Sequence, residues 1–444
     1  MSAVFDVFAT PDRGIVPRSG ADRTLVPVAW AVPQTCPRTT SPEVPVTQHD
    51  HAPIRRGTVR RAALVLLAGA GLLGATLQPA AAAASTPAQV GLVSFTKASY
   101  DAGTATAGLT IDWPDTRGAK SYEVFMSRSY SMSSAKKYKA TASTKTVSGL
   151  VRGGNYFFQV RAVNGSTVGS KSQRVGHTTI RRQGAGTGPT YRVMTYNVCS
   201  EKCSGWSSRK PAAIGRVTAH QPDVIAFQEA VKSSFAPGDL AGYTQVAYSN
   251  AKQLYFRTDR FDVAVGPDSA PRAGSIAMGN GKYAVWGEAV DRQHDDKHVI
   301  FVSVHTTPGK SSTAAKRRRS EVATLTKTVA NLNTAGLPVV FGGDFNSHKN
   351  RDDDYPASVL HAAGYYDAYD LAQSLTRQHY NSYNDFKTTP VTSVKWGDHV
   401  DHIWSDPTRT RVLRWTNAVL IKGGRLVTPI GSDHSPVVVD VQVD

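Results

Sequence analysis

Residues 339–346 read VVFGGDFN, in which an apolar run is followed by two glycines and then by the polar residues Asp344 and Asn346. The apolar run predicts a strand over residues 339–342. Outward from it, apolar runs predict strands at 191–197, 224–228, 253–257, 284–290, 299–305, 402–405 and 437–443, and helices at 210–220 and 312–333. Strands that alternate with helices predict an α/β domain over residues 190–444.

Polar residues follow several of these predicted strands. The motifs are Thr195-Tyr-Asn197, Phe227-Gln-Glu229, Ser303-Val-His305, Gly342-Gly-Asp344-Phe-Asn346, Val400-Asp401-His402 and Ser432-Asp433-His434-Ser-Pro436. Each motif alone is typical of a turn or a cap. Loops at strand ends can bring such residues together over one pocket, so the set as a whole predicts a site.

Together, and in this order, the motifs resemble the endonuclease/exonuclease/phosphatase superfamily, which includes deoxyribonuclease I-like nucleases, sphingomyelinases and inositol-phosphate phosphatases. The most specific parts are Gly342-Gly-Asp344-Phe-Asn346 and Ser432-Asp433-His434-Ser-Pro436. The resemblance spans residues 190–444. It implies a two-sheet α/β sandwich that hydrolyses a phosphoester with the help of Mg²⁺ or Mn²⁺.

The resemblance implies a metal site with three oxygen donors. Glu229 would be the principal ligand, and Asn197 and Asp433 would complete or support the site. Phosphoester hydrolysis needs a hard cation to neutralise the phosphate, and carboxylate oxygens suit Mg²⁺.

Five further residues would carry the reaction by the same resemblance. Asp344 would orient or deprotonate the attacking water, and Asn346 would hold that water or a phosphate oxygen. His434 would contact the scissile phosphate as a base or as a charged group, with Asp401 fixing its tautomer. His305 would act on the leaving group or on a phosphate oxygen. The sequence leaves open whether Asp344 or His434 takes the proton.

Three neighbouring features are interpreted as mainly structural. In a strand, the side chain of His402 points away from that of Asp401, so His402 is not expected in the site. The carboxylates of residues 352–354 are interpreted as a solvated turn, with a structural Ca²⁺ ion as the alternative. In the basic run 316–319, Arg318 with Glu321 matches a pair common in relatives, and the exposed members could contact a phosphate backbone.

An all-β region is predicted over residues 88–180. Strand-like runs at 109–113, 121–126 and 156–163 are separated by Gly, Asn, Ser and Thr clusters, which is typical of a β-sandwich. Residues 150–164, with Trp113 and Tyr122, resemble a fibronectin type III domain. In that family Trp113 would lie in the core, and Leu150 with Tyr156 would form a corner. Residues 181–189 are predicted to be a Gly-rich linker.

The first 84 residues are predicted to be a leader with a signal peptide. Residues 62–77 form an uncharged apolar run that follows four arginines and precedes the alanines 82–84, which is typical of a secretory signal cleaved near Ala84. The run is shorter than the roughly 20 residues that span a bilayer. Initiation at Val59 would give a compact signal peptide. The mature protein is therefore predicted to be secreted, without stable membrane insertion.

Cys199 and Cys203 are the two cysteines that remain after removal of the leader. In an exported protein, this spacing favours one local disulfide that clamps a loop. Two free thiols, or a transient metal site, are the alternatives.

The charge of the chain favours anionic partners. The net charge is +17, and residues 85–188 hold 14 Lys and Arg against 4 Asp and Glu, whereas residues 189–444 hold 29 against 25. The basic N-terminal region is interpreted either as an anchor on nucleic acid or on an anionic cell-surface polymer, or as a basic spacer.

A secreted, monomeric nuclease acting on DNA or RNA is the first prediction for the substrate. The alternatives are a sphingomyelinase-type phospholipase C, a small-molecule phosphatase, and an adhesion module with an inactive site. No long hydrophobic loop supports the lipid alternative. The Trp-Cys-Asp-Arg run expected for the inositol-phosphate branch is replaced by Trp-Gly-Asp-His at residues 396–399.

Overall fold

The computed structural model describes residues 85–101, 103–180, 183–349, 351, 354–392 and 398–444. The predicted leader and signal peptide, including Val59, lie outside these residues, as do Asp352 and Asp353 of the candidate Ca²⁺ turn. Within the part of the chain that is described, no helix is both long enough and apolar enough to cross a membrane.

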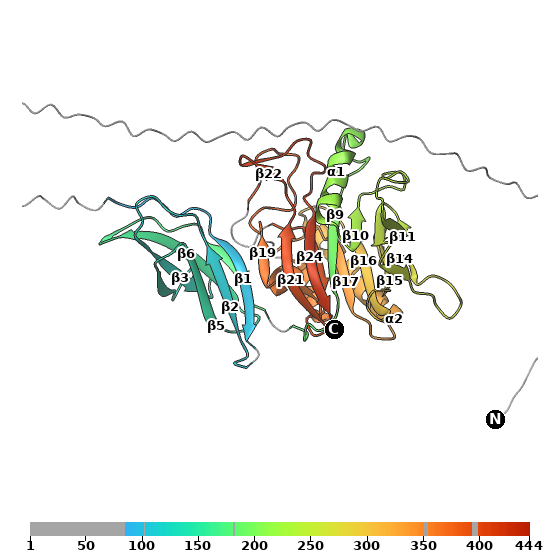
Figure 1. Cartoon of the computed structure of the whole chain (residues 1–444), viewed down its shortest axis with the longest axis horizontal. Coiled ribbons are helices and arrows are strands. Elements are labelled where there is room, and N and C mark those ends of the chain that lie inside the picture. Colours follow the sequence, from blue (N-terminus) through green and yellow to red (C-terminus); the bar gives the residue numbers. More distant parts are fainter. Residues whose placement is uncertain (1–84, 102, 181–182, 350, 352–353, 393–397) are drawn as a thin grey trace, which may run out of the picture. The chain divides into compact units, whose positions relative to one another are not determined.

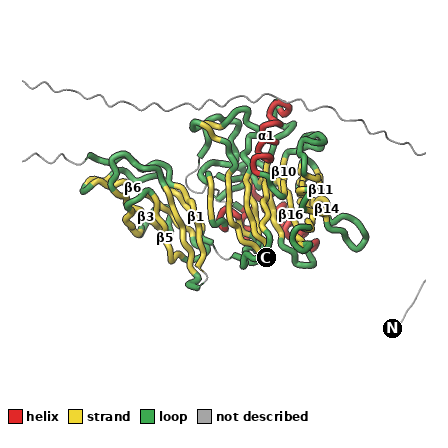
Figure 2. The backbone as a smooth tube through the Cα atoms, in the orientation of Figure 1, coloured by secondary structure: helices red, strands yellow, loops and turns green. Residues whose placement is uncertain are grey.

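The N-terminal region consists of antiparallel strands (Figure 2). One group has the order β1-β2-β5, and the other has the order β4-β3-β6-β7 with β8 paired to β6. The strands are β1 (Ser94–Asp101), β2 (Thr106–Asp112), β3 (Ser121–Ser127), β4 (Lys136–Ala140), β5 (Thr144–Leu150), β6 (Asn155–Asn164), β7 (Thr167–Val168) and β8 (Val175–Thr178).

Three aromatic residues hold parts of this region together. Trp113 is buried and packs edge-on against Tyr122, with ring centroids 5.2 Å apart. The hydroxyl of Tyr156 accepts a hydrogen bond of 2.9 Å from the backbone nitrogen of Val151, directly after Leu150. The aromatic residues therefore fix both the core and one turn of this region.

The C-terminal region carries two mixed sheets and the helices that cover them (Figure 1). The first sheet has the order β11 (Tyr243–Ser249), β12 (Lys252–Arg257), β10 (Val224–Gln228), β9 (Thr190–Asn197), β24 (Val437–Val443), β21 (Thr410–Asn417) and β19 (Ser374–Thr376). One antiparallel pair, Lys97 with Ser374, joins β1 to the β19 edge of this sheet. The second has the order β13 (Phe261–Val263), β15 (Lys282–Asp291), β16 (Lys297–His305), β17 (Val339–Asp344), β20 (Asp401–Ser405) and β18 (Tyr366–Asp367), with β14 (Ala273–Gly279) paired to β15. A small hairpin joins β22 (Ile421–Lys422) to β23 (Arg425–Leu426).

The two sheets pack face to face, and helices cover their outer faces. Between the sheets, the ring of Phe301 on β16 meets Tyr191 and Phe256 from the first sheet, with centroids 6.0 and 5.8 Å apart. The helices are α1 (Trp206–His220), α2 (Ser312–Leu332), α3 (Tyr355–Ala362) and α4 (Ala368–Leu371). Val217 of α1 packs on the first sheet, and Leu325 of α2 packs on the second. The predicted α/β class is confirmed, and each strand and helix predicted for residues 190–444 is present.

The two glycines of β17 allow this strand to lie in a crowded place. A Cβ atom on Gly342 would lie 3.3 Å from the Cβ of Ala226 in the facing sheet. A Cβ atom on Gly343 would lie 2.3 Å from the carbonyl oxygen of Val304 on the neighbouring strand. Backbone atoms cannot give way at such a distance, so the Gly-Gly pair sets how closely β17 approaches its neighbours.

Candidate active site

The strand register brings the predicted residues to one edge of the sandwich. β9 and β10 are parallel, with Asn197 opposite Gln228, so Glu229 follows directly at the same edge. β16 and β17 are also parallel, and His305 lies opposite Asp344, which in turn lies opposite Asp401 on β20. Residues opposite one another in a sheet point to the same face. The register alone therefore places His305, Asp344 and Asp401 side by side.

Asp344 lies at the centre of this group and is 2% exposed. Its Oδ2 accepts a hydrogen bond of 3.0 Å from the amide of Asn197 and lies 3.5 Å from Nε2 of His305 and 3.9 Å from Nε2 of His434. Its Oδ1 accepts a hydrogen bond of 2.8 Å from the backbone nitrogen of Asn346. The carboxylate is thus held in one orientation, with one oxygen directed at the predicted catalytic groups.

His434 forms a buried pair with Asp401. Its Nδ1 lies 2.8 Å from Oδ2 of Asp401, which leaves Nε2 facing Asp344. The hydroxyl of Ser382 accepts hydrogen bonds from the backbone nitrogens of Val400 and Asp401, and so fixes the start of β20. The sequence prediction that Asp401 orients His434 agrees with this geometry.

Glu229 contributes a carboxylate from the other sheet. Its Oε1 lies 3.7 Å from Nε2 of His305, and its backbone has φ of 51°, in the left-handed region. Asn346 has a similar φ of 50°. Such conformations cost on the order of 1 kcal/mol or more for residues other than glycine, and they concentrate at functional sites. The strain therefore supports a chemical role for both residues.

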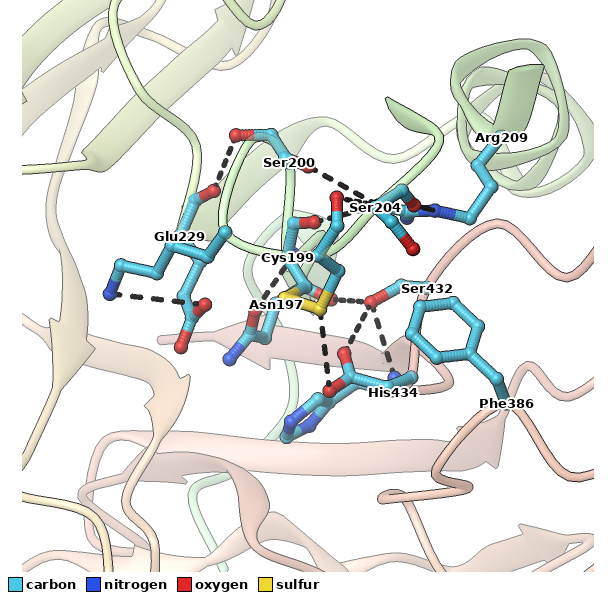
Figure 3. Close-up of a disulfide and its surroundings, with 12 residues drawn as sticks. Asn197, Cys199, Ser200, Ser204, Arg209, Glu229, Phe386, Ser432 and His434 are labelled. Atoms are coloured by element: carbon cyan, nitrogen blue, oxygen red, sulfur yellow. Dashed lines mark hydrogen bonds and ion pairs between the residues drawn. A yellow bond between two sulfur atoms is a disulfide. The ribbon is translucent and has the colours of Figure 1, made fainter. Parts of the chain in front are cut away.

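The Cys199–Cys203 disulfide forms beside Asn197 and closes a loop at this edge (Figure 3). Oδ1 of Asn197 accepts a hydrogen bond of 3.0 Å from the backbone nitrogen of Cys199, and the hydroxyl of Ser432 donates to the carbonyl oxygen of Asn197 at 2.7 Å. The hydroxyl of Ser432 also accepts a hydrogen bond from the backbone nitrogen of His434. One hydroxyl therefore ties the strand that ends in Asn197 to the segment that carries His434.

The donor set fits a hard divalent cation. Carboxylate oxygens and one amide oxygen, the ligands that Mg²⁺ prefers, come from Glu229, Asp344, Asp433 and Asn197. Ligand atoms of Asp344, Asp401 and His434 all lie within 4.8 Å of one another, so this buried group could bind a metal ion. It differs from the predicted set of Asn197, Glu229 and Asp433, which stays a prediction.

Burial and neighbouring charges separate the protonation states of the central residues. Burial raises the pKa of Asp344 to about 6. For His434, burial alone would lower the pKa, but the carboxylates of Asp401 and Asp344 outweigh it and raise the pKa to about 10. Burial, together with the ammonium groups of lysines 282, 252 and 202, holds the pKa of His305 well below 6.5. At neutral pH the site therefore holds an ionised Asp344, a charged His434 and a neutral His305.

The features interpreted as structural lie away from these groups. His402 points to the other face of β20, where its two ring nitrogens bond Oδ2 of Asp367 at 2.8 Å and the carbonyl oxygen of Ser347 at 2.9 Å. Arg318 is buried and donates to the carbonyl oxygens of Thr307 and Gly309. The structural interpretation of His402 and Arg318 agrees with these contacts.

Several residues at the site have no counterpart in the sequence analysis. The ring of Tyr383, 43% exposed, packs edge-on against His434 with centroids 5.1 Å apart. Ser382 precedes it. Lys202 lies 3.9 Å from Glu229, and the charges of Lys202, Lys252 and Lys282 act on His305. The polar residues found from sequence follow predicted strands, whereas Ser382 and Tyr383 come from an irregular segment. In the sequence, Lys252 could have been noticed only as a charged residue at the start of an apolar strand.

Comparison with known proteins places the chain in a family. A model of the endonuclease/exonuclease/phosphatase family matches residues 194–434. No curated protein matches the sequence.

Solved structures that are similar to this chain include a family protein, a sugar phosphatase and a DNA-bound protein. A family protein from Bacteroides thetaiotaomicron is 19% identical, with a TM-score of 0.46, and the match covers 58% of this chain and 99% of that one. The mannosyl-6-phosphatase of B. thetaiotaomicron VPI-5482 is 20% identical, with a TM-score of 0.45, covering 56% and 99%. TDP2 from D. rerio, complexed with a single-strand DNA product, is 12% identical, with a TM-score of 0.42, covering 57% and 98%. Because the family model matches more than half of the sequence, the chain belongs to the endonuclease/exonuclease/phosphatase family and is a phosphoesterase of that superfamily.

Proposed function

We propose that the protein is a secreted, Mg²⁺-dependent phosphodiesterase that hydrolyses DNA or RNA. The observation that carries the proposal is the convergence on Asp344. One oxygen of this buried carboxylate faces a charged histidine, a neutral histidine and an amide. This combination supplies a base, a cation for the phosphate and a group for the leaving oxygen, which are the needs of phosphoester hydrolysis.

Each residue then has one role. Asp344, with a pKa of about 6, is ionised at neutral pH and takes a proton from the attacking water. His434, held by Asp401, stays protonated and stabilises negative charge on the phosphate oxygens. Asn346 orients the water or a phosphate oxygen. His305 hydrogen bonds to the leaving oxygen as its bond to phosphorus breaks, and the released alkoxide then takes a proton from solvent water.

Asn197, Glu229 and Asp433 would hold the divalent cation. When bound, the cation would neutralise negative charge on the phosphate. Burial raises the pKa of Asp433, which is the direction expected for a carboxylate kept near other carboxylates before a cation balances them.

Nucleic acid is favoured over lipid by two features of the chain. Tyr383 presents an exposed aromatic ring next to His434, where a nucleobase adjoining the scissile phosphate can stack. The excess of Lys and Arg over residues 85–188 suits a polyanion. The exposed large hydrophobic residues of the described part, among them Val151, Tyr248 and Val265, come from separate segments, so they support no membrane-binding loop.

Secretion and the fibronectin type III identity of residues 88–180 belong to the same proposal. The Cys199–Cys203 disulfide suits an oxidising compartment. The buried Trp113 and the hydrogen bond from Val151 to Tyr156 support the sandwich assignment. Secretion is tested by N-terminal sequencing of the protein recovered from culture medium, where a start near Ser85 is expected.

The catalytic proposal is tested by assaying the purified full chain on plasmid DNA, RNA and sphingomyelin vesicles in parallel. Each reaction is run with Mg²⁺, with Mn²⁺ and with a chelator. His434→Ala is the inactive variant, and His298→Ala is the matched control because His298 lies at the opposite end of β16 from His305. Chelator-sensitive cleavage of DNA or RNA that only His434→Ala abolishes is the expected result. Activity on sphingomyelin alone, or on no polymer, would overturn the nucleic-acid assignment.

A further inference from the structure

A group of three lysines adjoins the catalytic centre on its Glu229 side. Lys202 lies in the disulfide loop, and its Nζ is 3.9 Å from Oε2 of Glu229. Lys252 begins β12, and Lys282 begins β15. The three residues come from one loop and the first positions of two strands, and the charges of all three act on His305. We call these residues the lysine group.

The backbone holds two of these lysines next to each other. Each follows a tight turn, at Asn250-Ala251 before Lys252 and at Asn280-Gly281 before Lys282. The amide of Asn250 donates a hydrogen bond of 3.2 Å to the carbonyl oxygen of Gly281, so the two turns are joined. The positions of Lys252 and Lys282 are therefore set by the fold, whereas Lys202 reaches Glu229 from the exposed disulfide loop.

Lys252 is the most informative member because it is buried without a partner. The residue is only 3% exposed, and within the described residues no hydrogen bond or ion pair is formed by its ammonium. It lies opposite Gln228 in the sheet, so it shares the face from which Gln228 reaches Ser303 on β16. Burial, with the charges of Lys282 and Lys202, lowers its pKa to about 8. The stem of Lys252 is thus buried while its ammonium is not fully enclosed, so an anionic ligand can reach it.

The charges at the site indicate how many negative charges a bound ligand can bring. The carboxylates of Glu229, Asp344, Asp401 and Asp433 are matched in number by His434 and the lysine group, and Glu321, which also acts on Lys282, is matched by the buried Arg318 one turn earlier on α2. A bound divalent cation would leave two positive charges in excess. A scissile phosphodiester brings a single negative charge, so one further anionic group is needed to balance the site.

We propose that the lysine group is a second phosphate-binding site, which selects substrates that carry another phosphate next to the scissile one. The inference rests on the proposed function, because it specifies which phosphodiesters that same centre prefers. In a nucleic acid strand, the neighbouring phosphate or a terminal phosphate would occupy this site. Hydrogen bonds between a charged donor and a charged acceptor are worth about 1.5–3 kcal/mol, so losing one lysine should reduce the preference about tenfold or more.

The test compares three thymidine dinucleotides with the same scissile bond: one without a terminal phosphate, one with a 5′-phosphate and one with a 3′-phosphate. The full chain should cleave one phosphorylated form with a kcat/KM about tenfold or more above the unphosphorylated form. Lys252→Met should remove most of that ratio. Lys202→Met, at a side chain 58% exposed, repeats the test at a position where folding is not at risk. Lys327→Met, which removes the same charge from an exposed position of α2, should keep the ratio.

Calorimetric titration of the metal-free protein with inorganic phosphate gives a second readout that does not require turnover. Phosphate should bind the wild-type chain and Lys327→Met, and should bind Lys252→Met about tenfold more weakly. If all three dinucleotides are cleaved with equal kcat/KM, the second site is overturned while the proposed function stands. If no dinucleotide is cleaved but phosphate binding depends on Lys252 and Lys202, the site is supported and the nucleic-acid assignment fails.

Discussion

Two buried histidine–aspartate pairs share strand β20 and differ in what the second ring nitrogen contacts. His434 with Asp401 and His402 with Asp367 each have a nitrogen-to-oxygen distance of 2.8 Å. Nε2 of His402 is bonded to the carbonyl oxygen of Ser347, whereas Nε2 of His434 is 3.9 Å from Asp344. The pairing alone therefore does not mark a catalytic histidine. The pair proposed to be catalytic differs in having a second ring nitrogen that faces another carboxylate, that of Asp344.

The largest expected effect is the loss of activity in His434→Ala, which should distinguish the His434 pair from the His402 pair. His434→Ala should lower kcat/KM by on the order of 10³, because it removes the charge that stabilises the phosphate. Initial rates on the best polymer of the parallel assay measure this. The thermal transition should also fall, because the variant leaves the buried carboxylate of Asp401 without its partner, so the rates are measured below that transition. A loss below tenfold would mean that His434, like His402, has only a structural role.

At the other pair we expect a loss of stability without a large loss of activity. His402→Ala should lower the free energy of unfolding by about 3 kcal/mol, because it leaves the buried carboxylate of Asp367 without its partner. Urea unfolding followed by circular dichroism measures the change. Below its melting transition, the variant should retain most of its kcat/KM. Full stability with lost activity would show that the roles of the two pairs are exchanged.

The pH dependence of stability sharpens the comparison. Burial alone would lower the pKa of His402, but Asp367 outweighs it and raises the pKa from 6.5 to about 9. The folded state therefore binds this proton more tightly than the unfolded state does, so the stabilisation is complete below pH 6.5 and is lost as the pH rises through 9. The gap in unfolding free energy between wild type and His402→Ala should shrink by on the order of 2 kcal/mol over that interval. A gap that widens with pH would contradict the assignment.

The smallest effect concerns the disulfide, which lies near the His434 pair and not near the His402 pair. Sγ of Cys203 lies 3.9 Å from Oδ2 of Asp433, the residue before His434. Cys203→Ser should lower kcat/KM a few-fold and the free energy of unfolding by about 2 kcal/mol, as expected for so short a loop. Mild reduction of the wild type should reproduce both changes. Unchanged activity in both experiments would separate the loop from the catalytic edge.

The sequence predicts the strands and the residues that end them, because both leave local patterns. Asn197, His305 and Asp344 each end an apolar run, and parallel strands bring such ends to one edge. Ser382 and Tyr383 could not be found in this way, since they belong to an irregular segment whose position depends on the tertiary fold. Lys252 was missed because its interest comes from burial without a partner, and burial is decided by the packing of the two sheets.

The crowding at Gly342 and Gly343 changes how the Gly-Gly-Asp-Phe-Asn motif should be understood in an evolutionary sense. Neither glycine contacts the reacting groups, yet a side chain at Gly343 would overlap the backbone at Val304. Selection for a closely approaching strand would keep both glycines even in a descendant that had lost its chemistry. Persistence of Gly342 and Gly343 in a related sequence would therefore report inheritance of the fold, whereas persistence of Asp344 and Asn346 would report inheritance of the proposed reaction.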